Sequence, residues 1–232
     1  MEDSFLERAS QMERMWWLLL SGLSTTHLLW AVALFAEPAR FVHKIPLPQI
    51  AAVAHLAAAV LIVAGPRAAG LSISAALLTY YWAFVKPLEP IAEPQSVGIL
   101  AISVALLVSM LHSENFFTRL LLRGGLAYPF FEWGLDALRN PYHFAAYLTA
   151  NTVTKPLFTY LPLYPSIFAL GAFEVVLSVW AVSGPGFKIA CMTSALTLLV
   201  FSAVAGYPLA LPQNIALIAT AVDISRRPNS FS

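Results

Sequence analysis

Cysteine and charge are both scarce in this sequence. Its 232 residues include one cysteine, Cys191, so the chain can form neither an internal disulfide nor a CxxC pair for thiol redox chemistry or metal binding. Only 11% of the residues are charged, the formal net charge is +1, and no basic block is interleaved with aromatic residues. Nucleic acid is therefore not an expected partner.

The common signatures of metal and cofactor sites are also missing. The sequence has no HExxH motif and no pair of histidines at helical spacing, which are typical of zinc sites. It has no GxGxxG, Walker or GxSxG motif either. We therefore expect no metal ion, no bound nucleotide and no other cofactor.

Hydrophobic residues are abundant instead. They make up 59% of the chain, and the mean hydropathy of +0.74 lies far above that of a soluble domain. A helix needs about 17 to 25 apolar residues to span a bilayer. Apolar runs bounded by proline, glycine or charge predict such helices over residues 15–36, 48–65, 69–86, 95–112, 116–138, 164–183, 187–206 and 211–226. The predicted fold is an all-α, polytopic membrane helix bundle of about eight transmembrane helices, with membrane lipids around it.

The distribution of basic residues predicts the orientation of this bundle. An even number of spans places both termini on one side of the membrane. Eight lysine and arginine residues fall on that side and five on the other, so the positive-inside rule predicts cytoplasmic termini. No small-residue cleavage site follows the first apolar run, which we therefore expect to be a retained span of a multi-pass protein.

The chain contains an internal repeat. Three pairs of segments match in the same order: WAVALFAEPARF (30–41) with WGLDALRNPYHF (133–144), AGPRAAGLSISAALL (64–78) with SGPGFKIACMTSALT (183–197), and KPLEPIAEPQ (86–95) with YPLALPQ (207–213). We predict two tandem four-helix repeats, residues 1–113 and 114–232, related by an axis along the membrane normal. The second repeat carries an inserted loop near 145–162, which is either a lid or only a longer loop.

The second repeat contains the pattern GLDALRNPYHF (134–144), then LGAFE (170–174) on the next helix, and then a Gly-Pro turn. In these features it resembles the DoxX-like family of four-helix membrane proteins. It implies a four-helix fold and a role as a subunit of a membrane redox assembly, such as a thiosulfate–quinone oxidoreductase. The chain departs from some members by lacking cysteine pairs. In the first repeat, His55 replaces the family's glutamate, and Ala33 stands where the second repeat has Asp136.

Ionisable side chains within the predicted spans are the candidate functional groups. At membrane depth each costs about 2.5 to 3.5 kcal/mol on insertion scales, so such residues face the bundle interior or a wet cavity. Glu174 lies in the middle of LGAFEVVLSVW, and a neutral carboxyl in apolar surroundings is suited to act as a general acid. His55 occupies the corresponding position in the first repeat. We predict that His55 and Glu174 meet across a central crevice as a proton-transfer pair.

A second group of candidates follows one helix. Tyr128, Glu132 and Asp136 recur every four residues, so they share a helix face, which we expect to line a cavity. Arg139 offers Asp136 a purely structural salt bridge as an alternative. The predicted catalytic residues are Glu174, His55, Asp136 and Glu132, and the predicted substrate-binding residues are His27, Tyr81, Tyr128 and Trp133. Packing for the histidines and an aromatic belt for Tyr81 are the alternatives.

These residues favour a membrane enzyme that needs no cofactor. Glu174 would act as acid or base, with His55 or Asp136 as its partner and Glu132 as a second carboxyl, in a polar cavity between the repeats. The expected substrate is a lipophilic small molecule from the bilayer, and the expected reaction is epoxide opening or hydrolysis, cyclisation or isomerisation. One alternative is a DoxX-like, quinone-associated subunit whose protein partner holds the redox centre. Another is a structural subunit or a transporter.

Overall fold

The computed structural model describes residues 2–41, 45, 47–85, 93–111, 115–183, 185–206 and 211–227. Within these ranges the regular elements are all helices: α1 (Glu2–Ala36), α2 (Pro38–Phe41), α3 (Pro48–Ala64), α4 (Arg67–Phe84), α5 (Glu93–Leu111), α6 (Phe116–Arg139), α7 (Pro141–Ala150), η1 (Lys155–Thr159), α8 (Leu163–Ser183), α9 (Phe187–Ala205) and α10 (Leu211–Ser225). The all-α prediction is confirmed for this part of the chain. The proline-rich matching segments 86–92 and 207–210 lie outside it.

Local signals set the ends of these helices. Pro48 begins α3 and Pro141 begins α7, at the position where a missing N–H costs no helical hydrogen bond. The Asn115 side chain caps α6 by accepting a hydrogen bond from the Thr118 N–H at 2.9 Å. Gly206 follows the end of α9 with a φ of 66°, which favours glycine. These punctuating residues explain why the predicted and observed helices nearly coincide.

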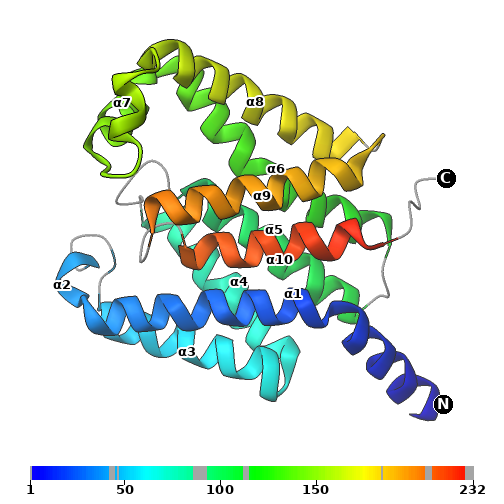
Figure 1. Cartoon of the computed structure of the whole chain (residues 1–232). Coiled ribbons are helices and arrows are strands. Elements are labelled where there is room, and N and C mark those ends of the chain that lie inside the picture. The colour runs from blue at the N-terminus through cyan, green and yellow to red at the C-terminus, as the bar shows by residue number, and fades with distance from the viewer. Residues whose placement is uncertain are drawn as a thin grey trace.

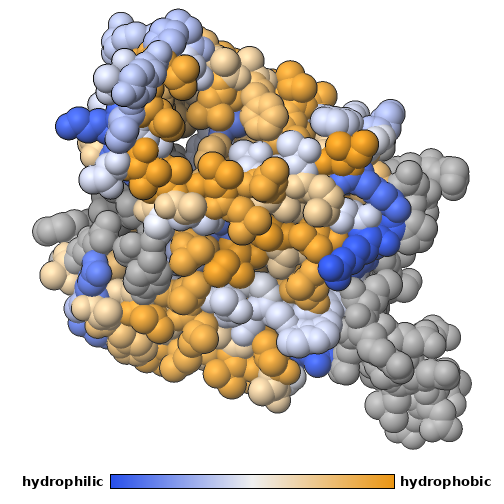
Figure 2. All heavy atoms as spheres, viewed as in Figure 1, coloured by the Kyte–Doolittle hydropathy of each residue, from blue (hydrophilic) through white to orange (hydrophobic). Residues whose placement is uncertain are grey.

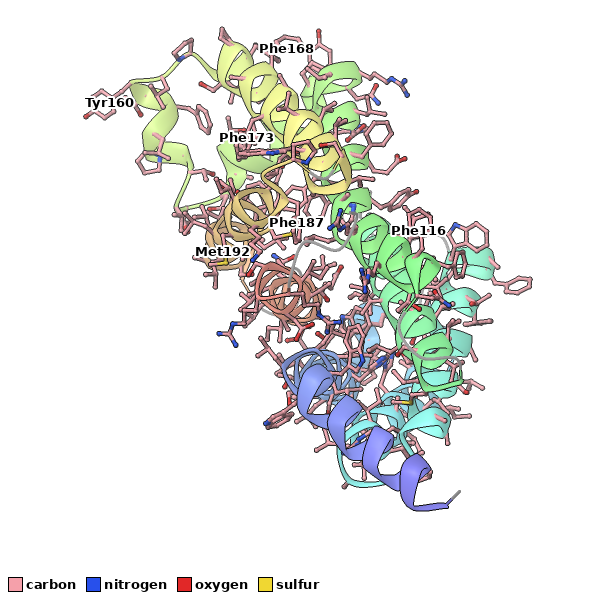
Figure 3. All side chains as sticks on the ribbon, turned by 90° about the vertical axis from the view of Figure 1, so that its right-hand side faces the viewer. Phe116, Tyr160, Phe168, Phe173, Phe187 and Met192 are labelled. Carbon is pink, nitrogen blue, oxygen red and sulfur yellow. The ribbon has the colours of Figure 1, made fainter. Side chains whose placement is uncertain are left out.

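The insertion in the second repeat is more regular than the predicted loop at 145–162. Pro141 starts the helix α7 directly after α6, and α7 continues to Ala150 before η1 follows. At its C-terminal end, the Asn151 side-chain amide donates to the Val204 carbonyl of α9 at 2.9 Å. Tyr160, which is 88% exposed, points away from the helices (Figure 3). The insertion is thus a helical segment tied to α9.

The helices form a central group with one pair on each side (Figure 1). The centre consists of α1, α5, α6 and α10, in which α1 packs on α10 and α5 packs on α6. The pair α3 and α4 flanks this group on one side, and the pair α8 and α9 flanks it on the other. The N-terminal end of α1 and the C-terminal end of α10 lie on the same side of the molecule.

The centre of the bundle is packed with hydrocarbon side chains. The fully buried residues at this position come from all four central helices and include Leu23, Ile102, Leu126, Phe130 and Leu217. Buried polar side chains lie on these helices as well, among them Arg123, Asn214 and Thr220. The polar crevice between the two repeats therefore stays a prediction.

Small residues allow this close approach. A Cβ atom added to Gly125 of α6 would lie 2.6 Å from the carbonyl oxygen of Gly98 on α5. Gly22 occupies the matching position on α1, and a Cβ there would collide with the side chain of Ala219 on α10. Close contact between helix backbones through small residues is typical of membrane helix pairs. Glycine contacts of the same kind thus join the two halves at the α5–α6 and α1–α10 contacts.

The Thr26 side chain of α1 links the two halves by hydrogen bonds to the backbone of α10. Its hydroxyl donates to the Pro212 carbonyl at 2.6 Å and accepts from the Ala216 N–H at 3.1 Å, so it stands between two groups that would otherwise pair within the helix. The side chain is fully buried. An α1 hydroxyl therefore completes the first turn of α10.

We expect Thr26→Val to lower the free energy of unfolding by about 1 kcal/mol, because a buried donor and acceptor lose their partner. The midpoint of SDS-induced unfolding of the purified protein measures this loss. Thr25→Val is the control, since the Thr25 hydroxyl is exposed and bonds the Ser21 carbonyl of its own helix at 2.8 Å. Equal midpoints for the two variants would contradict a linking role for Thr26.

Among the residues that the structure describes, three helical segments are long and apolar enough to cross a bilayer: Trp16–Ala36, Leu163–Ser183 and Phe187–Ala205. Pro48–Ala64 and Ser96–Met110 are apolar but shorter. This is fewer than the predicted eight, because α10 has only 15 residues and α6 carries charged side chains along its length. The face in Figure 2 is nevertheless covered by hydrophobic side chains from several helices. These features are compatible with a membrane protein.

Candidate functional site

Two histidines form a direct pair inside the first half of the chain. His27 of α1 and His55 of α3 are both fully buried, and their Nδ1 atoms lie 2.7 Å apart. The two helices pack along their length, and the Ser24 hydroxyl adds a bond to the Ala59 carbonyl at 2.9 Å. One Nδ1 must therefore carry a proton and the other must accept it. A single proton thus lies between the two Nδ1 atoms.

Polar side chains extend this pair in both directions. The His55 Nε2 atom lies 2.8 Å from the Tyr81 hydroxyl, and the His27 Nε2 atom lies 2.7 Å from the Ser74 hydroxyl. Ser74 is in turn 2.8 Å from the Ser103 hydroxyl of α5, which donates to the Ile99 carbonyl at 2.9 Å. We call the chain Tyr81–His55–His27–Ser74–Ser103 the histidine relay. It joins all four long helices of the first half.

The bond from Ser103 to a carbonyl sets the direction of the whole relay. Since Ser103 gives its proton to Ile99, it must accept from Ser74, which then accepts from the His27 Nε2–H. His27 Nδ1 is consequently the acceptor for the His55 Nδ1–H, and His55 Nε2 accepts from the Tyr81 hydroxyl. Every polar hydrogen in the relay then has an acceptor, and all point inward.

The relay has one outer and one inner end. Tyr81 is partly exposed, whereas both histidines, Ser74 and Ser103 are buried. Trp30 packs edge-on against both imidazoles, with ring centroids 5.8 Å from His27 and 5.2 Å from His55. The relay thus connects a partly exposed tyrosine to two buried imidazoles.

The structure brings together three residues that the sequence singled out, His27, His55 and Tyr81. The sequence reasoning missed the contribution of Ser74 and Ser103, and it assigned Trp30 to the repeat alone. Ser74 and Tyr81 are seven residues apart, which places them on one face of α4. That spacing was the available signal for Ser74.

The predicted pairing of His55 with Glu174 is wrong. Both ring nitrogens of His55 are occupied by His27 and Tyr81. Glu174 lies on α8, in the flanking pair on the opposite side of the central helices (Figure 1). Its side chain is 1% exposed, and its buried Oε2 atom has no hydrogen-bond donor among the residues that the structure describes. The hydrocarbon core separates the two groups.

The predicted polar stripe on α6 does not point into the bundle. Tyr128 is exposed, and Glu132 and Asp136 are only partly buried. The Asp136 carboxylate accepts a bond from the Asn140 side chain at 2.9 Å and lies 3.5 Å from His143 Nδ1. These residues face outward because the opposite face of α6 carries the glycine and hydrophobic residues that pack on α5 and α8.

Trp133 is buried in the hydrophobic core. Its ring meets Phe201 of α9 edge-on at 6.1 Å. It therefore belongs to the packing between α6 and α9. Within the described ranges, no three histidine, cysteine, aspartate or glutamate residues are grouped so as to hold a metal ion.

Comparison with known proteins found no matching family model, no matching curated protein and no matching solved structure. The resemblance to DoxX-like proteins therefore stays a prediction from the sequence.

Proposed function

We propose that this chain is a multi-pass membrane protein that catalyses an acid–base reaction on a lipophilic small molecule, with the histidine relay as its proton store. The observation that carries the proposal is the unbroken set of hydrogen bonds from the partly exposed Tyr81 hydroxyl to the buried His27. A histidine can accept a proton on one ring nitrogen and release one from the other. Glu174, Asp136 and Glu132 have no place in this relay.

Proton uptake runs inward along the relay. When the Tyr81 oxygen takes a proton from the substrate, its own proton moves to His55 Nε2. The His55 Nδ1 proton then moves to His27 Nδ1 across the 2.7 Å contact. His27 then carries a proton on both ring nitrogens and donates to His55 and to Ser74. The reverse sequence returns the proton through the Tyr81 hydroxyl to another atom of the substrate.

The inner end of the relay favours proton return over proton transport. The Ser103 hydroxyl ends the relay at the Ile99 carbonyl, which accepts a hydrogen bond but has no proton to pass on. A proton that enters at Tyr81 therefore leaves at Tyr81. Isomerisation and cyclisation of an alkene both remove and add a proton with no net change on the protein, so they fit this geometry better than coupled transport does.

The surroundings of Tyr81 support a lipophilic substrate. Tyr80, Trp82 and Phe84 at the same end of α4 are exposed, and Tyr80 packs against Tyr81 at 6.0 Å. Aromatic side chains exposed at one end of a helix are typical of the boundary between lipid and water. A molecule dissolved in the bilayer would reach the Tyr81 hydroxyl along this surface.

The matched contacts of the two halves support the rest of the proposed architecture. α1 packs on α3 as α6 packs on α8, and α4 packs on α5 as α9 packs on α10. The α5–α6 and α10–α1 contacts between the halves also correspond. This pattern is that expected for two tandem repeats related by a two-fold axis. In this arrangement the eight long helices span the membrane and both termini are cytoplasmic.

Replacing Tyr81 tests the proposal. We expect Tyr81→Phe to lower turnover by about tenfold to 100-fold, because the relay loses the hydroxyl that is proposed to meet the substrate. Purified protein in nanodiscs would be assayed with a panel of lipophilic polyenes, epoxides and allylic alcohols, with products identified by mass spectrometry. Tyr80→Phe removes a neighbouring, exposed hydroxyl and should leave turnover unchanged. Equal turnover in the two variants, or no product from any substrate class, would reject the proposal.

A further inference from the structure

Residues 141–162, which carry α7 and η1 and which we call the α7–η1 segment, expose a group of large side chains. The segment lies at the end of the molecule away from the N-terminal end of α1 and the C-terminal end of α10 (Figure 1). A single exposed apolar residue is normal, whereas a group of them marks an interaction surface. Tyr160 is the most exposed of this group and points away from the helices (Figure 3). Four others are also largely exposed: Tyr142, Val153, Leu157 and Leu161.

The inner side of the α7–η1 segment is held against the bundle. Phe144 of α7 is buried in the hydrophobic core, and α7 packs on α8 and α6. The Thr154 hydroxyl donates to the Leu148 carbonyl at 2.7 Å, and the Asn151 amide donates to the Val204 carbonyl of α9 at 2.9 Å. These contacts fix the backbone of the segment. The exposed side chains therefore form a defined outer face.

The aromatic residues of this face are tyrosines. Tyr142 and Tyr160 belong to the α7–η1 segment, and Tyr142 meets Tyr164 at the start of α8 edge-on at 5.8 Å. Tyrosine is enriched where lipid meets water, because its ring is apolar and its hydroxyl is polar. Figure 2 shows the segment as paler side chains at the edge of the hydrophobic face of the long helices. That is the level of the lipid headgroups if the hydrophobic face lies in a bilayer.

The charge of this part of the chain is of one sign. No aspartate or glutamate occurs between Asp136 and Glu174, whereas Arg139 and Lys155 fall in that stretch and are both exposed. Asp136 lies at the junction with α6, where its carboxylate is 3.5 Å from His143 Nδ1. Basic side chains close to a bilayer are attracted by anionic headgroups. The face thus combines tyrosines with positive charge.

We propose that the outer face of the α7–η1 segment rests on the surface of a bilayer that contains anionic phospholipid, with Tyr160 among the headgroups and Lys155 beside a phosphate. A second copy of this chain packed on the same face would bring like charges together, which anionic lipid avoids. The inference rests on the membrane arrangement proposed above and is independent of the histidine relay.

A spin label measures the depth of this face in the full-length protein. Tyr160→Cys is labelled with a nitroxide, and the wild-type protein, whose Cys191 is fully buried, gives the background. The nanodiscs hold one chain each in an equal mixture of phosphatidylglycerol and phosphatidylcholine. Power saturation with oxygen and with a water-soluble nickel chelate gives the depth. We expect the label about 5 to 10 Å below the lipid surface, where interfacial segments bury their apolar side.

A label on Leu196→Cys is the control for the membrane arrangement, because Leu196 is exposed on the long helix α9. We expect that label to lie in the hydrocarbon layer. If it does and the label at position 160 is as accessible to the nickel chelate as one in water, the inference about the α7–η1 segment is overturned while the arrangement stands. If the label at position 196 is also in water, the proposed membrane arrangement fails as well.

Removing one charge tests the preference for anionic lipid. With the label at position 160, Lys155→Gln should lower the ratio of immersed to water-exposed label about fivefold, from the attraction of one basic residue to an anionic surface. In nanodiscs of phosphatidylcholine alone the same substitution should have no effect. Lys188→Gln is the matched control, since Lys188 is an exposed lysine in the first turn of α9, at the other end of that helix from Val204. Equal ratios for the two variants would overturn the role of anionic lipid.

Discussion

Replacing His27 with phenylalanine should reduce turnover by about 100-fold or more, up to about 10⁴-fold, which is the range for loss of a general acid–base group. The substitution cuts the histidine relay at its centre, so His55 keeps Tyr81 but loses the group that stores the proton. The fold should survive, because the second half carries Phe130 at the corresponding position in its own buried core. The measurement is turnover of the substrate that responds to Tyr81→Phe.

A solvent isotope effect separates a relay from a packing role. If proton transfer through the two histidines limits turnover, the wild-type protein should be slower in deuterium oxide, and His27→Phe should lose this dependence along with its activity. His143→Phe is the control, because His143 is exposed on α7 and far from the relay in sequence and structure. Should His27→Phe keep half of the wild-type turnover, His27 would be a packing residue only.

Gly125→Ala should destabilise the protein by about 3 kcal/mol, the upper part of the usual range for overpacking. The added methyl group would lie 2.6 Å from the Gly98 carbonyl oxygen, and a backbone atom in a packed helix pair cannot move aside easily. We expect the α5–α6 contact between the two halves to open. Thermal unfolding in detergent, followed by size-exclusion chromatography, measures the loss.

The neighbouring glycine provides the matched control. A Cβ atom on Gly124 would have no atom within 4 Å, so Gly124→Ala should instead stabilise α6 by up to about 1 kcal/mol through its better helix propensity. The two substitutions add the same methyl group to adjacent residues of one helix, and the expected effects have opposite signs. Shifts of the same sign would show that the glycine contact is not what limits packing here.

The positions of the long helices were predictable because their signals are local. Apolar runs bounded by Pro48, Asn115, Pro141 or Gly206 gave helix ends close to those observed, since each of these residues starts or stops a helix within a single turn. The helical insertion α7 was missed because its aromatic and polar residues do not form an apolar run. The number of long apolar helices was overestimated because hydropathy was judged by runs, without weighing the charges on α6.

The site was only partly predictable, because it depends on which helix faces are neighbours. The cost of burying an ionisable side chain identified His27 and His55 individually. The internal repeat, however, suggested that His55 and Glu174, which occupy equivalent positions, meet at the axis that relates the two repeats. The central helices place those positions, His55 and Glu174, on opposite flanks instead. His27 instead pairs with His55 within one half, between two consecutive long helices. The sequence alone does not give the rotation of these helices about their axes, which decides whether the two side chains meet.

The inner end of the histidine relay, where the Ile99 carbonyl has no proton to pass on, has a consequence for the cell. A hydrogen-bonded path open at both ends would let protons cross an energised membrane and would dissipate the gradient that drives ATP synthesis. Because the histidine relay ends at the Ile99 carbonyl, the function that we propose would let protons enter and leave through Tyr81 without carrying them across the membrane, so the protein would not uncouple it.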